Sequence, residues 1–210
     1  MLRGMGIAAR VKGRFPERGV VVSNHMGYLD IIAFAAAHPC AFVSKAELAN
    51  LPVLGWMTTM AGTVYVERGS GGSAQRAKQG MQAAADAGVP VVFFPEGTST
   101  DGTTVLPFHS GLLAQAIAAG QPVTAAHVSY RLTRPNGPGV TIPSQVSYWD
   151  DTPLFQHIFR LLAVRGIEVE LRIAGASIEF STPDDRKLAA EQARAAVIGL
   201  GGVRNAGTAD

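Results

Sequence analysis

The sequence predicts a single α/β domain with a mixed, largely parallel central sheet covered by helices. The prediction rests on short apolar runs that alternate with longer helix-like stretches along the 210 residues. The chain is 47% hydrophobic, enough for one substantial core, and contains no linker, internal repeat or low-complexity tract. We place the domain at residues 19–200, between a basic segment at 1–18 and a loose tail at 201–210.

Six runs are predicted as strands because they are apolar, rich in β-branched residues and too short for helices. They are Val20–Ser23, Cys40–Ser44, Thr63–Val66, Pro90–Phe94, Val123–Tyr130 and Glu168–Ile173. Five longer stretches are predicted as helices. They are Leu29–Ala37, Gly72–Ala87, Gly111–Ala119, Leu154–Ala163 and Pro183–Leu200. For the last helix, Thr182 is the expected N-cap and Pro183 the first helical residue.

The segment at 1–18 gathers bases among apolar residues. The bases are Arg3, Arg10, Lys12, Arg14 and Arg18. Such a segment can lie on an anionic bilayer, with each base contributing about 1 kcal/mol. A solvated, frayed tail is an equal alternative, because Gly4, Gly6 and Gly13 weaken any helix.

Composition excludes several classes of protein. No apolar run reaches the ~18–20 residues that span a bilayer, and the N-terminal residues lack the layout of a signal peptide. The single cysteine, Cys40, cannot form an intrachain disulfide, and a net charge of +2 is too small to indicate nucleic-acid binding. The five histidines are scattered without ligand spacing, so we expect no metal and no cofactor.

The most informative residues follow the first predicted strand. Asn24 and His25 leave that strand, and Asp30 lies about one turn into the next helix. The carboxylate can bond one imidazole nitrogen and leave the other free to accept a proton. This base and orienter, without a protein nucleophile, suit an enzyme that activates a hydroxyl of its substrate. The alternative is a loop histidine beside a carboxylate that the helix dipole favours.

Two further motifs also end predicted strands. Arg68 follows one strand and offers a fork for a phosphate or carboxylate. After another, Gly97 permits a positive φ, and Thr98 and Ser99 add hydroxyls that can bind an anion. In an open α/β sheet the carboxyl ends of the strands face one crevice, so we expect the three motifs to meet there.

Asn-His-x4-Asp, Gly-x-x-aromatic-aliphatic-x-Arg and Phe-Pro-Glu-Gly-Thr, in this order, resemble the motifs of the 1-acylglycerol-3-phosphate O-acyltransferases. The resemblance runs from about Gly19 to about Ile178. It implies a glycerolipid acyltransferase-like fold and transfer of a fatty acyl group from a thioester donor, acyl-CoA or acyl carrier protein. The implied acceptor is a lysolipid hydroxyl, at the cytoplasmic face of a membrane with which the enzyme associates peripherally.

The resemblance also implies roles for individual residues. His25 would be the general base and Asp30 its partner. Substrate-binding roles fall to Asn24, Lys45, Arg68, Glu96, Gly97, Thr98 and Ser99. For Lys45, which would stabilise the thioester oxyanion, an ordinary solvated lysine is an equal alternative.

One departure from the family pattern concerns the acceptor. Members that act on lysophosphatidic acid usually carry arginine after Phe-Pro-Glu-Gly-Thr, where this chain has Ser99. Serine cannot offer a bidentate charged fork to a phosphate monoester. The acceptor is therefore expected to be less negatively charged, such as lyso-ornithine lipid or another lysophospholipid.

Other functions are weaker matches. Gly69, Gly71 and Ala74 imitate a dinucleotide-binding fingerprint, but no acidic residue ends a second strand about 20 residues on. A serine hydrolase is disfavoured because no Gly-x-Ser-x-Gly elbow occurs. The remaining alternative is a catalytically silent lipid-binding module of the same fold.

Overall fold

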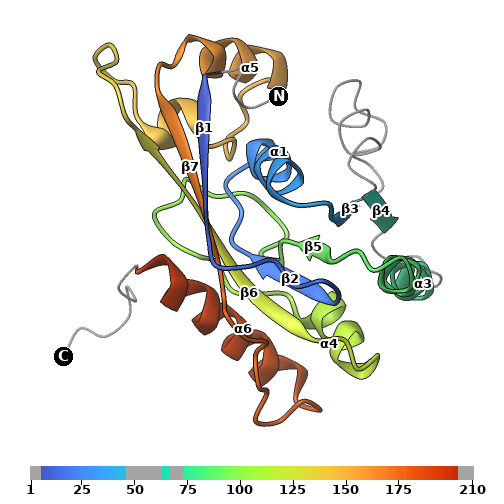
Figure 1. The fold of residues 1–210 in the computed structure, drawn as a ribbon. Coiled ribbons are helices and arrows are strands. Elements are labelled where there is room, and N and C mark those ends of the chain that lie inside the picture. Colours follow the sequence, from blue (N-terminus) through green and yellow to red (C-terminus); the bar gives the residue numbers. More distant parts are fainter. Residues whose placement is uncertain (1–5, 46–62, 67–72, 203–210) are drawn as a thin grey trace.

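A computed structural model describes residues 6–45, 63–66 and 73–202 of this chain. Seven strands form one sheet in the order β1-β7-β6-β2-β5-β3-β4 (Figure 1). The strands are β1 (Ile7–Lys12), β2 (Val20–Ser23), β3 (Ala41–Lys45), β4 (Thr63–Val66), β5 (Val91–Phe93), β6 (Val123–Leu132) and β7 (Ile167–Ile173). The helices are α1 (Tyr28–Ala37), α3 (Ser73–Asp86), α4 (Ser110–Ala118), α5 (Leu154–Ala163) and α6 (Arg186–Gly201), with a π-helical turn η3 (Ile142–Val146).

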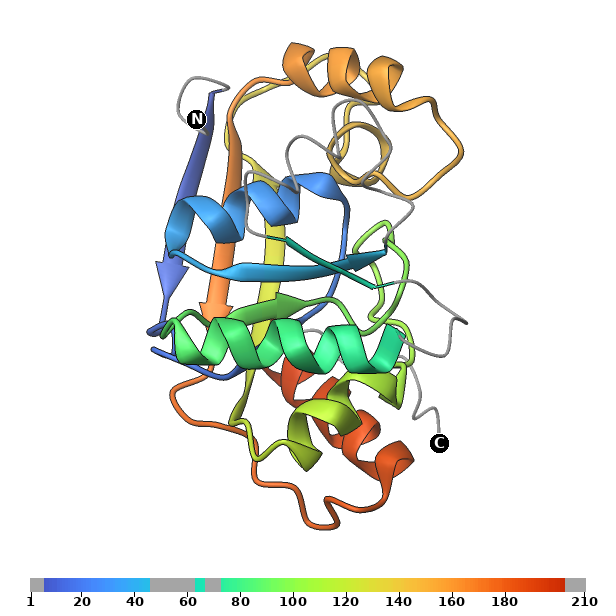
Figure 2. The ribbon, with the colours of Figure 1, turned by 90° about the vertical axis from the view of Figure 1, so that its right-hand side faces the viewer.

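The predicted fold class is confirmed. Strands β6, β2, β5, β3 and β4 are mutually parallel, whereas β7 pairs antiparallel with β6 and parallel with β1. All six predicted strands and all five predicted helices are present, with ends that differ by a few residues. The sheet is strongly twisted, so that β1 and β7 run roughly vertically in Figure 2 whereas β3 and β5 run roughly horizontally.

The basic N-terminal segment contributes a strand that the sequence analysis did not predict. Residues 7–12 form β1, an edge strand, so the sheet begins before residue 19. Two of its bases pair with acids of β7: Arg10 Nε lies 3.0 Å from Glu168 Oε2, and Lys12 Nζ lies 2.9 Å from Glu170 Oε2. The protein's own carboxylates therefore engage these bases. Membrane contact by the segment stays a prediction.

The two faces of the sheet are covered by different helices, because successive residues of a strand point to opposite faces. In β2, Val21 packs into a core with α1 and α5, whereas Val20 and Val22 pack into a second core with α3, α4 and α6. Figures 1 and 2 show these two helix layers on either side of the sheet. Within the described residues, no helix is both long enough and apolar enough to cross a membrane.

The start of the last helix differs from the prediction. The expected N-cap, Thr182, is wrong: α6 begins at Arg186, and the Asp185 carboxylate accepts from the N–H groups of Lys187 (3.0 Å) and Leu188 (3.1 Å). A side-chain acceptor for two free helical N–H groups outweighs the preference for proline at the first position. At the other end, α6 continues to Gly201, and residues 203–210 lie outside the described part.

The parallel strands place the predicted motifs at one edge. Strand β2 pairs with β5 in the register Val22 with Phe93, so the residues three positions further on, His25 and Glu96, leave the sheet side by side. Strand β3 runs parallel to β5 and ends at Lys45 at the same edge. The expectation that the motifs meet at one edge is confirmed for the motifs after β2 and β5, whereas the third motif residue, Arg68, lies outside the described residues.

Candidate active site

The turn between β2 and α1 brings a histidine and a carboxylate together. His25 Nδ1 lies 2.8 Å from Asp30 Oδ2, and the Asp30 side chain is fully buried in the first turn of α1. The same oxygen accepts from the N–H groups of Met26 (2.6 Å) and Gly27 (3.1 Å). These N–H groups are the free donors of a helix start, where the dipole favours a negative charge. The predicted His25–Asp30 contact is confirmed.

Tyr130, which the sequence analysis did not identify, completes the coordination of Asp30. Its hydroxyl donates to Asp30 Oδ1 at 2.6 Å from β6. Burial, together with the nearby Asp30 charge, raises the pKa of Tyr130 well above its ordinary value, so it stays a donor. Four donors, two on the main chain and two on side chains, thus meet two carboxylate oxygens, a set that matches an ionised carboxylate.

The imidazole of His25 is fixed on its other sides as well. Its ring stacks on Phe94, with ring centroids 4.1 Å apart and an angle of 14° between the planes. The side chain is 19% exposed, and Nε2 has no hydrogen-bond partner in the part of the chain that is described. When Nδ1 donates to Asp30, Nε2 carries a lone pair. The arrangement therefore offers one oriented proton acceptor at the surface.

Glu96 braces the histidine from the neighbouring strand. Its Oε1 accepts from the His25 N–H and its Oε2 from the Leu106 N–H, each at 2.7 Å. The residue is 3% exposed. Burial raises its pKa to about 7, and the two N–H donors offset only part of this effect. Each oxygen thus bonds a main-chain N–H, so Glu96 helps to position His25, and its contact with substrate stays a prediction.

The loop after β5 wraps around the same turn. Gly97 has φ +72°, and its N–H donates to the Phe94 carbonyl at 3.1 Å. Thr98 is exposed beside it. The Ser99 hydroxyl donates to the Tyr148 carbonyl, and the N–H of Thr100 donates to the His25 carbonyl at 2.9 Å. Of the four predicted binding residues after β5, which are Glu96, Gly97, Thr98 and Ser99, Thr98 is the exposed one.

Asn24 ties the turn to β6. Its Oδ1 accepts from the Val128 N–H at 2.8 Å, and its Nδ2 donates to the Val128 carbonyl at 3.0 Å. The side chain thus pairs with a strand residue as another peptide group would, and it is 5% exposed. This geometry lets Asn24 position the turn, and the predicted contact of Asn24 with substrate stays a prediction.

A second wall of the site comes from the segment between η3 and α5. The Tyr148 N–H donates to the Met26 carbonyl at 2.7 Å. This close approach requires glycine at position 27, where φ is +144° and a Cβ would lie 2.9 Å from Tyr148 N.

His157 of α5 bonds both the Tyr28 hydroxyl, through Nδ1, and the Ser147 carbonyl, through Nε2, each at 2.9 Å. Helix α5 is therefore bonded to the start of α1.

Other predicted residues are placed less fully. The backbone of Lys45 lies at the end of β3, on the edge that carries His25, while Arg68 and the Gly69–Gly71 stretch lie outside the described residues. A search of the described residues finds no group of three or more His, Cys, Asp or Glu side chains that could hold a metal ion.

Comparisons with known proteins identify relatives of this chain. A sequence model of the family described as Acyltransferase matches residues 8–131. Lyso-ornithine lipid O-acyltransferases of Rhodobacter capsulatus and Pseudomonas aeruginosa are 36% and 35% identical over 86% and 90% of this chain. The aligned regions span 63% and 70% of those two proteins. A 1-acyl-sn-glycerol-3-phosphate acyltransferase of Neisseria gonorrhoeae is 35% identical over 61% of this chain and 53% of its own length.

A solved structure has the same fold. The crystal structure of the 1-acyl-sn-glycerophosphate acyltransferase of Thermotoga maritima matches with a TM-score of 0.63 and 18% identity. The match covers 99% of this chain and 77% of that one.

The first prediction concerns Asn24. Replacement by alanine leaves the Val128 N–H and carbonyl buried without partners, so Asn24→Ala should lower the free energy of unfolding by about 1–3 kcal/mol. The matched control is Asn136→Ala, because Asn136 makes the same pair of bonds, to Arg165 N (2.8 Å) and O (3.0 Å), at an exposed position. Urea denaturation should show the smaller loss for the control. Equal losses would contradict the positioning role.

The second prediction concerns the pH dependence of stability. The pKa of Glu96 is about 7 in the folded protein, against an ordinary value of 4.5. Between these values the folded state binds more protons than the unfolded chain, so this group lowers stability as the pH rises from about 4.5 to about 7. The fall should reach about 3 kcal/mol at most. In urea titrations across this range, Glu96→Gln should remove this part of the slope. An unchanged slope would exclude Glu96 as its source.

Proposed function

The chain belongs to the acyltransferase family, and we propose that it moves a fatty acyl group from a thioester donor to a lysolipid hydroxyl, with His25 as the general base. One observation carries the proposal: His25 is bonded to the buried Asp30 through Nδ1 and leaves Nε2 without a partner in the described chain. The names of the relatives support a lysolipid acceptor. The donor would be acyl-CoA or acyl carrier protein.

General-base catalysis fits the acidities of the groups involved. A lipid alcohol has a pKa near that of water, roughly 15.7, and an ordinary imidazole has one near 6.5, so the proton must move during attack. The acceptor oxygen forms a bond to the thioester carbonyl carbon while its proton passes to His25 Nε2. When the C–S bond breaks, the imidazolium can return that proton to the leaving thiolate. Asp30 stabilises the imidazolium in between.

Alignment of two amphiphiles is the other task of the site. The thioester is already activated, so the enzyme gains most from holding donor and acceptor together and from stabilising the oxyanion. Lys45 is the proposed oxyanion stabiliser, because β3 ends with it on the edge that carries His25. Arg68 and Thr98 are the proposed contacts to the acceptor headgroup. The cytoplasmic face of a membrane is the proposed place of action.

Ser99 bears on the choice of acceptor. Its hydroxyl donates to the Tyr148 carbonyl, so in this chain the position ties two loops together and offers no positive charge. A phosphate monoester therefore lacks a fork here. We propose a less charged acceptor, in keeping with the lyso-ornithine lipid O-acyltransferases among the relatives.

A catalytically silent lipid-binding module is the competing function. Such a module would not need the four donors that hold Asp30, nor a histidine whose second nitrogen lacks a partner among the described residues. The geometry therefore favours an enzyme, and a turnover measurement separates the two.

The third prediction is a graded loss of turnover. His25→Ala should lower kcat on the order of 10²–10⁴-fold or more, because the proton acceptor is gone. Asp30→Asn should cause a loss approaching this, and Tyr130→Phe a smaller one, because it removes one of the four bonds to Asp30. The assay follows thiol release from acyl-CoA in the presence of lyso-ornithine lipid.

The matched control for this series is His38→Ala, a histidine at the other end of α1 that should keep wild-type turnover. Circular dichroism and the unfolding midpoint verify that each variant is folded. Wild-type turnover in folded His25→Ala would end the assignment of the base. Turnover by acyl carrier protein thioesters alone would identify the donor and leave the base unchanged.

The fourth prediction concerns acceptor selectivity. Ser99→Arg should raise the rate with lysophosphatidic acid relative to lyso-ornithine lipid, because it adds a charged fork. Ser99→Ala is the control, since it removes the bond to Tyr148 without adding charge. The rate of Ser99→Ala with lysophosphatidic acid relative to lyso-ornithine lipid should equal that of the wild type. The same ratio in all three proteins would show that position 99 does not select the acceptor.

A further inference from the structure

Helix α5 presents large apolar side chains on two sides. On the inner side, His157 and Leu161 are each only 2% exposed. On the outer side, three residues at helical spacing face solvent: Phe155 is 57% exposed, Phe159 72% and Leu162 55%. A surface helix ordinarily turns charged or polar residues outward. The outer side of α5 is therefore apolar where a solvent-exposed helix face is ordinarily polar.

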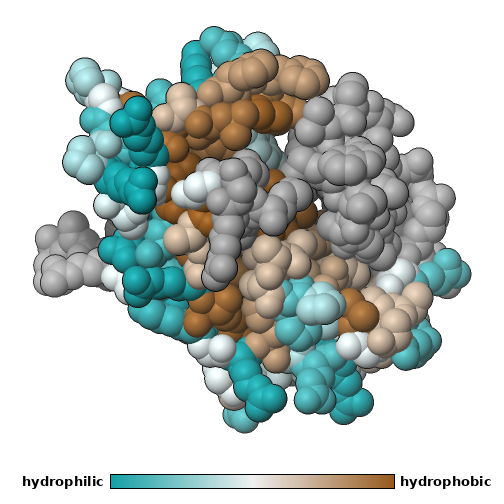
Figure 3. Space-filling view, turned by 45° about the horizontal axis from the view of Figure 1, so that its top comes forward, coloured by the Kyte–Doolittle hydropathy of each residue, from teal (hydrophilic) through white to brown (hydrophobic). Residues whose placement is uncertain are grey.

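Trp149, just before the helix, extends this apolar surface. It is 49% exposed, and its indole N–H donates to the Pro143 carbonyl at 3.0 Å, which leaves the ring without a free polar group. We call Trp149, Phe155, Phe159 and Leu162 the α5 ridge. Of the five large hydrophobic side chains exposed in the described chain, four are in the ridge, so the exposure is concentrated. Figure 3 shows hydrophobic side chains gathered at the upper end of the molecule, where Figure 1 places α5.

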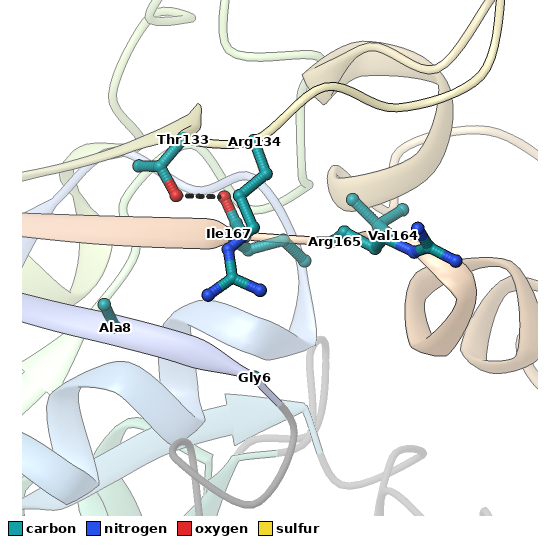
Figure 4. A pocket seen from close by; sticks show the side chains of 8 residues that line it. Gly6, Ala8, Thr133, Arg134, Val164, Arg165 and Ile167 are labelled. Atoms are coloured by element: carbon teal, nitrogen blue, oxygen red, sulfur yellow. Dashed lines mark hydrogen bonds between the residues drawn. The ribbon is translucent and has the colours of Figure 1, made fainter.

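Three exposed arginines lie at the carboxyl end of the helix. Arg160 is on α5, Arg165 follows it, and Arg134 comes from the loop after β6. Arg134 and Arg165 line a cavity of about 340 Å³ at the start of β7, and no carboxylate lines it. Figure 4 shows the Arg134 guanidinium in the cavity beside Ile167, and Arg165 extending away from it.

The opposite end of the helix is acidic. Asp150 and Asp151 are exposed and precede α5, whereas Arg165 follows its carboxyl end. A bare apolar ridge with cations at one end matches the surface of an anionic bilayer, where an amphipathic helix buries apolar side chains among the headgroups and bases meet lipid phosphates.

Hydrogen bonds connect the segment that carries the ridge to the candidate active site. The Tyr148 N–H bonds the Met26 carbonyl within the β2–α1 turn, and Trp149 is the next residue. His157, on the inner side of α5, bonds the Tyr28 hydroxyl at the start of α1. A surface docked through the ridge would therefore lie against the wall of the site that holds His25 and Asp30.

We propose that the α5 ridge docks on an anionic lipid bilayer, with its aromatic and leucine side chains in the interfacial layer and Arg134, Arg160 and Arg165 on headgroup phosphates. The inference rests on the proposed function, because an enzyme that acylates a lysolipid must meet its acceptor at a bilayer. It assigns membrane contact to residues 149–165 and Arg134, far along the chain from the basic segment at 1–18.

The test is partition of the whole chain onto vesicles, measured without substrate. Vesicles of phosphatidylcholine, with and without phosphatidylglycerol, are sedimented with the protein. The double variant Phe155→Ser, Phe159→Ser should lower partition on the order of tenfold or more on both vesicle types. Arg160→Gln with Arg165→Gln should lower only the part that depends on phosphatidylglycerol, and added salt should do the same. The comparison variant is Val11→Ser, an apolar residue 43% exposed on β1 within the segment at 1–18: it should bind as wild type if the ridge carries the contact, and a loss equal to that of the double variant would overturn the inference.

Several results would overturn the inference. One is a double serine variant that partitions onto vesicles as strongly as the wild type. Another is a wild-type protein that does not bind phosphatidylglycerol vesicles. So would light scattering that shows a dimer which the serine variant converts to monomers, because the ridge would then bind a second copy.

Turnover on acceptor dispersed in detergent micelles is measured in parallel. The serine variant should keep this turnover and lose it on vesicles. Binding without any turnover in the wild type would contradict the proposed function and leave the docking surface standing. If the variant turns over substrate on vesicles as fast as the wild type, the proposed docking surface would be contradicted and the proposed function would stand.

Discussion

The buried carboxylate of Asp30 is the group on which the rest of the site depends. A charge with no exposure to water is costly unless donors surround it. Here the donors come from three places: the two main-chain N–H groups that immediately precede α1, the His25 ring and the Tyr130 hydroxyl on β6. The same bonds that satisfy the charge therefore fix the helix start, join it to the sheet and set the orientation of the imidazole. Catalytic geometry and local stability have a common cause.

The second buried carboxylate, Glu96, joins the loop after β5 to the turn after β2. It accepts from two N–H groups where Asp30 has four donors, and burial raises its pKa to about 7. Its bonds to His25 and Leu106 hold the loop of β5 against the turn of β2 across the parallel register. Together with the Asn24 pair on Val128, they make the backbone around His25 rigid from three strands. An imidazole held in this way loses little orientational freedom when substrate binds.

The sequence predicted local features better than pairings across the sheet. The pair His25 and Asp30 lies within one turn of chain, so spacing was enough to find it. Tyr130 is a hundred residues from Asp30 in sequence, and the alternation of β6 gives its face but not its neighbour. The same limit hid β1, because its bases find their partners only after β7 is placed beside it. The letters alone do not show that main-chain groups bond the polar atoms of Glu96 and Asn24, and contact of these two residues with substrate stays a prediction.

The segment from η3 to α5 contacts the turn that carries His25 on one side and faces solvent on the other. Its inner side supplies His157 and Tyr148, whose bonds close the turn that carries His25 and require glycine at position 27. Its outer side holds most of the large apolar surface exposed in the described chain. Burial lowers the pKa of His157, which keeps the ring neutral and able to accept from Tyr28 while it donates to Ser147. His157 thus bonds the start of α1 through Tyr28 and the segment before α5 through Ser147, so one imidazole joins the proposed docking helix to the turn that carries His25.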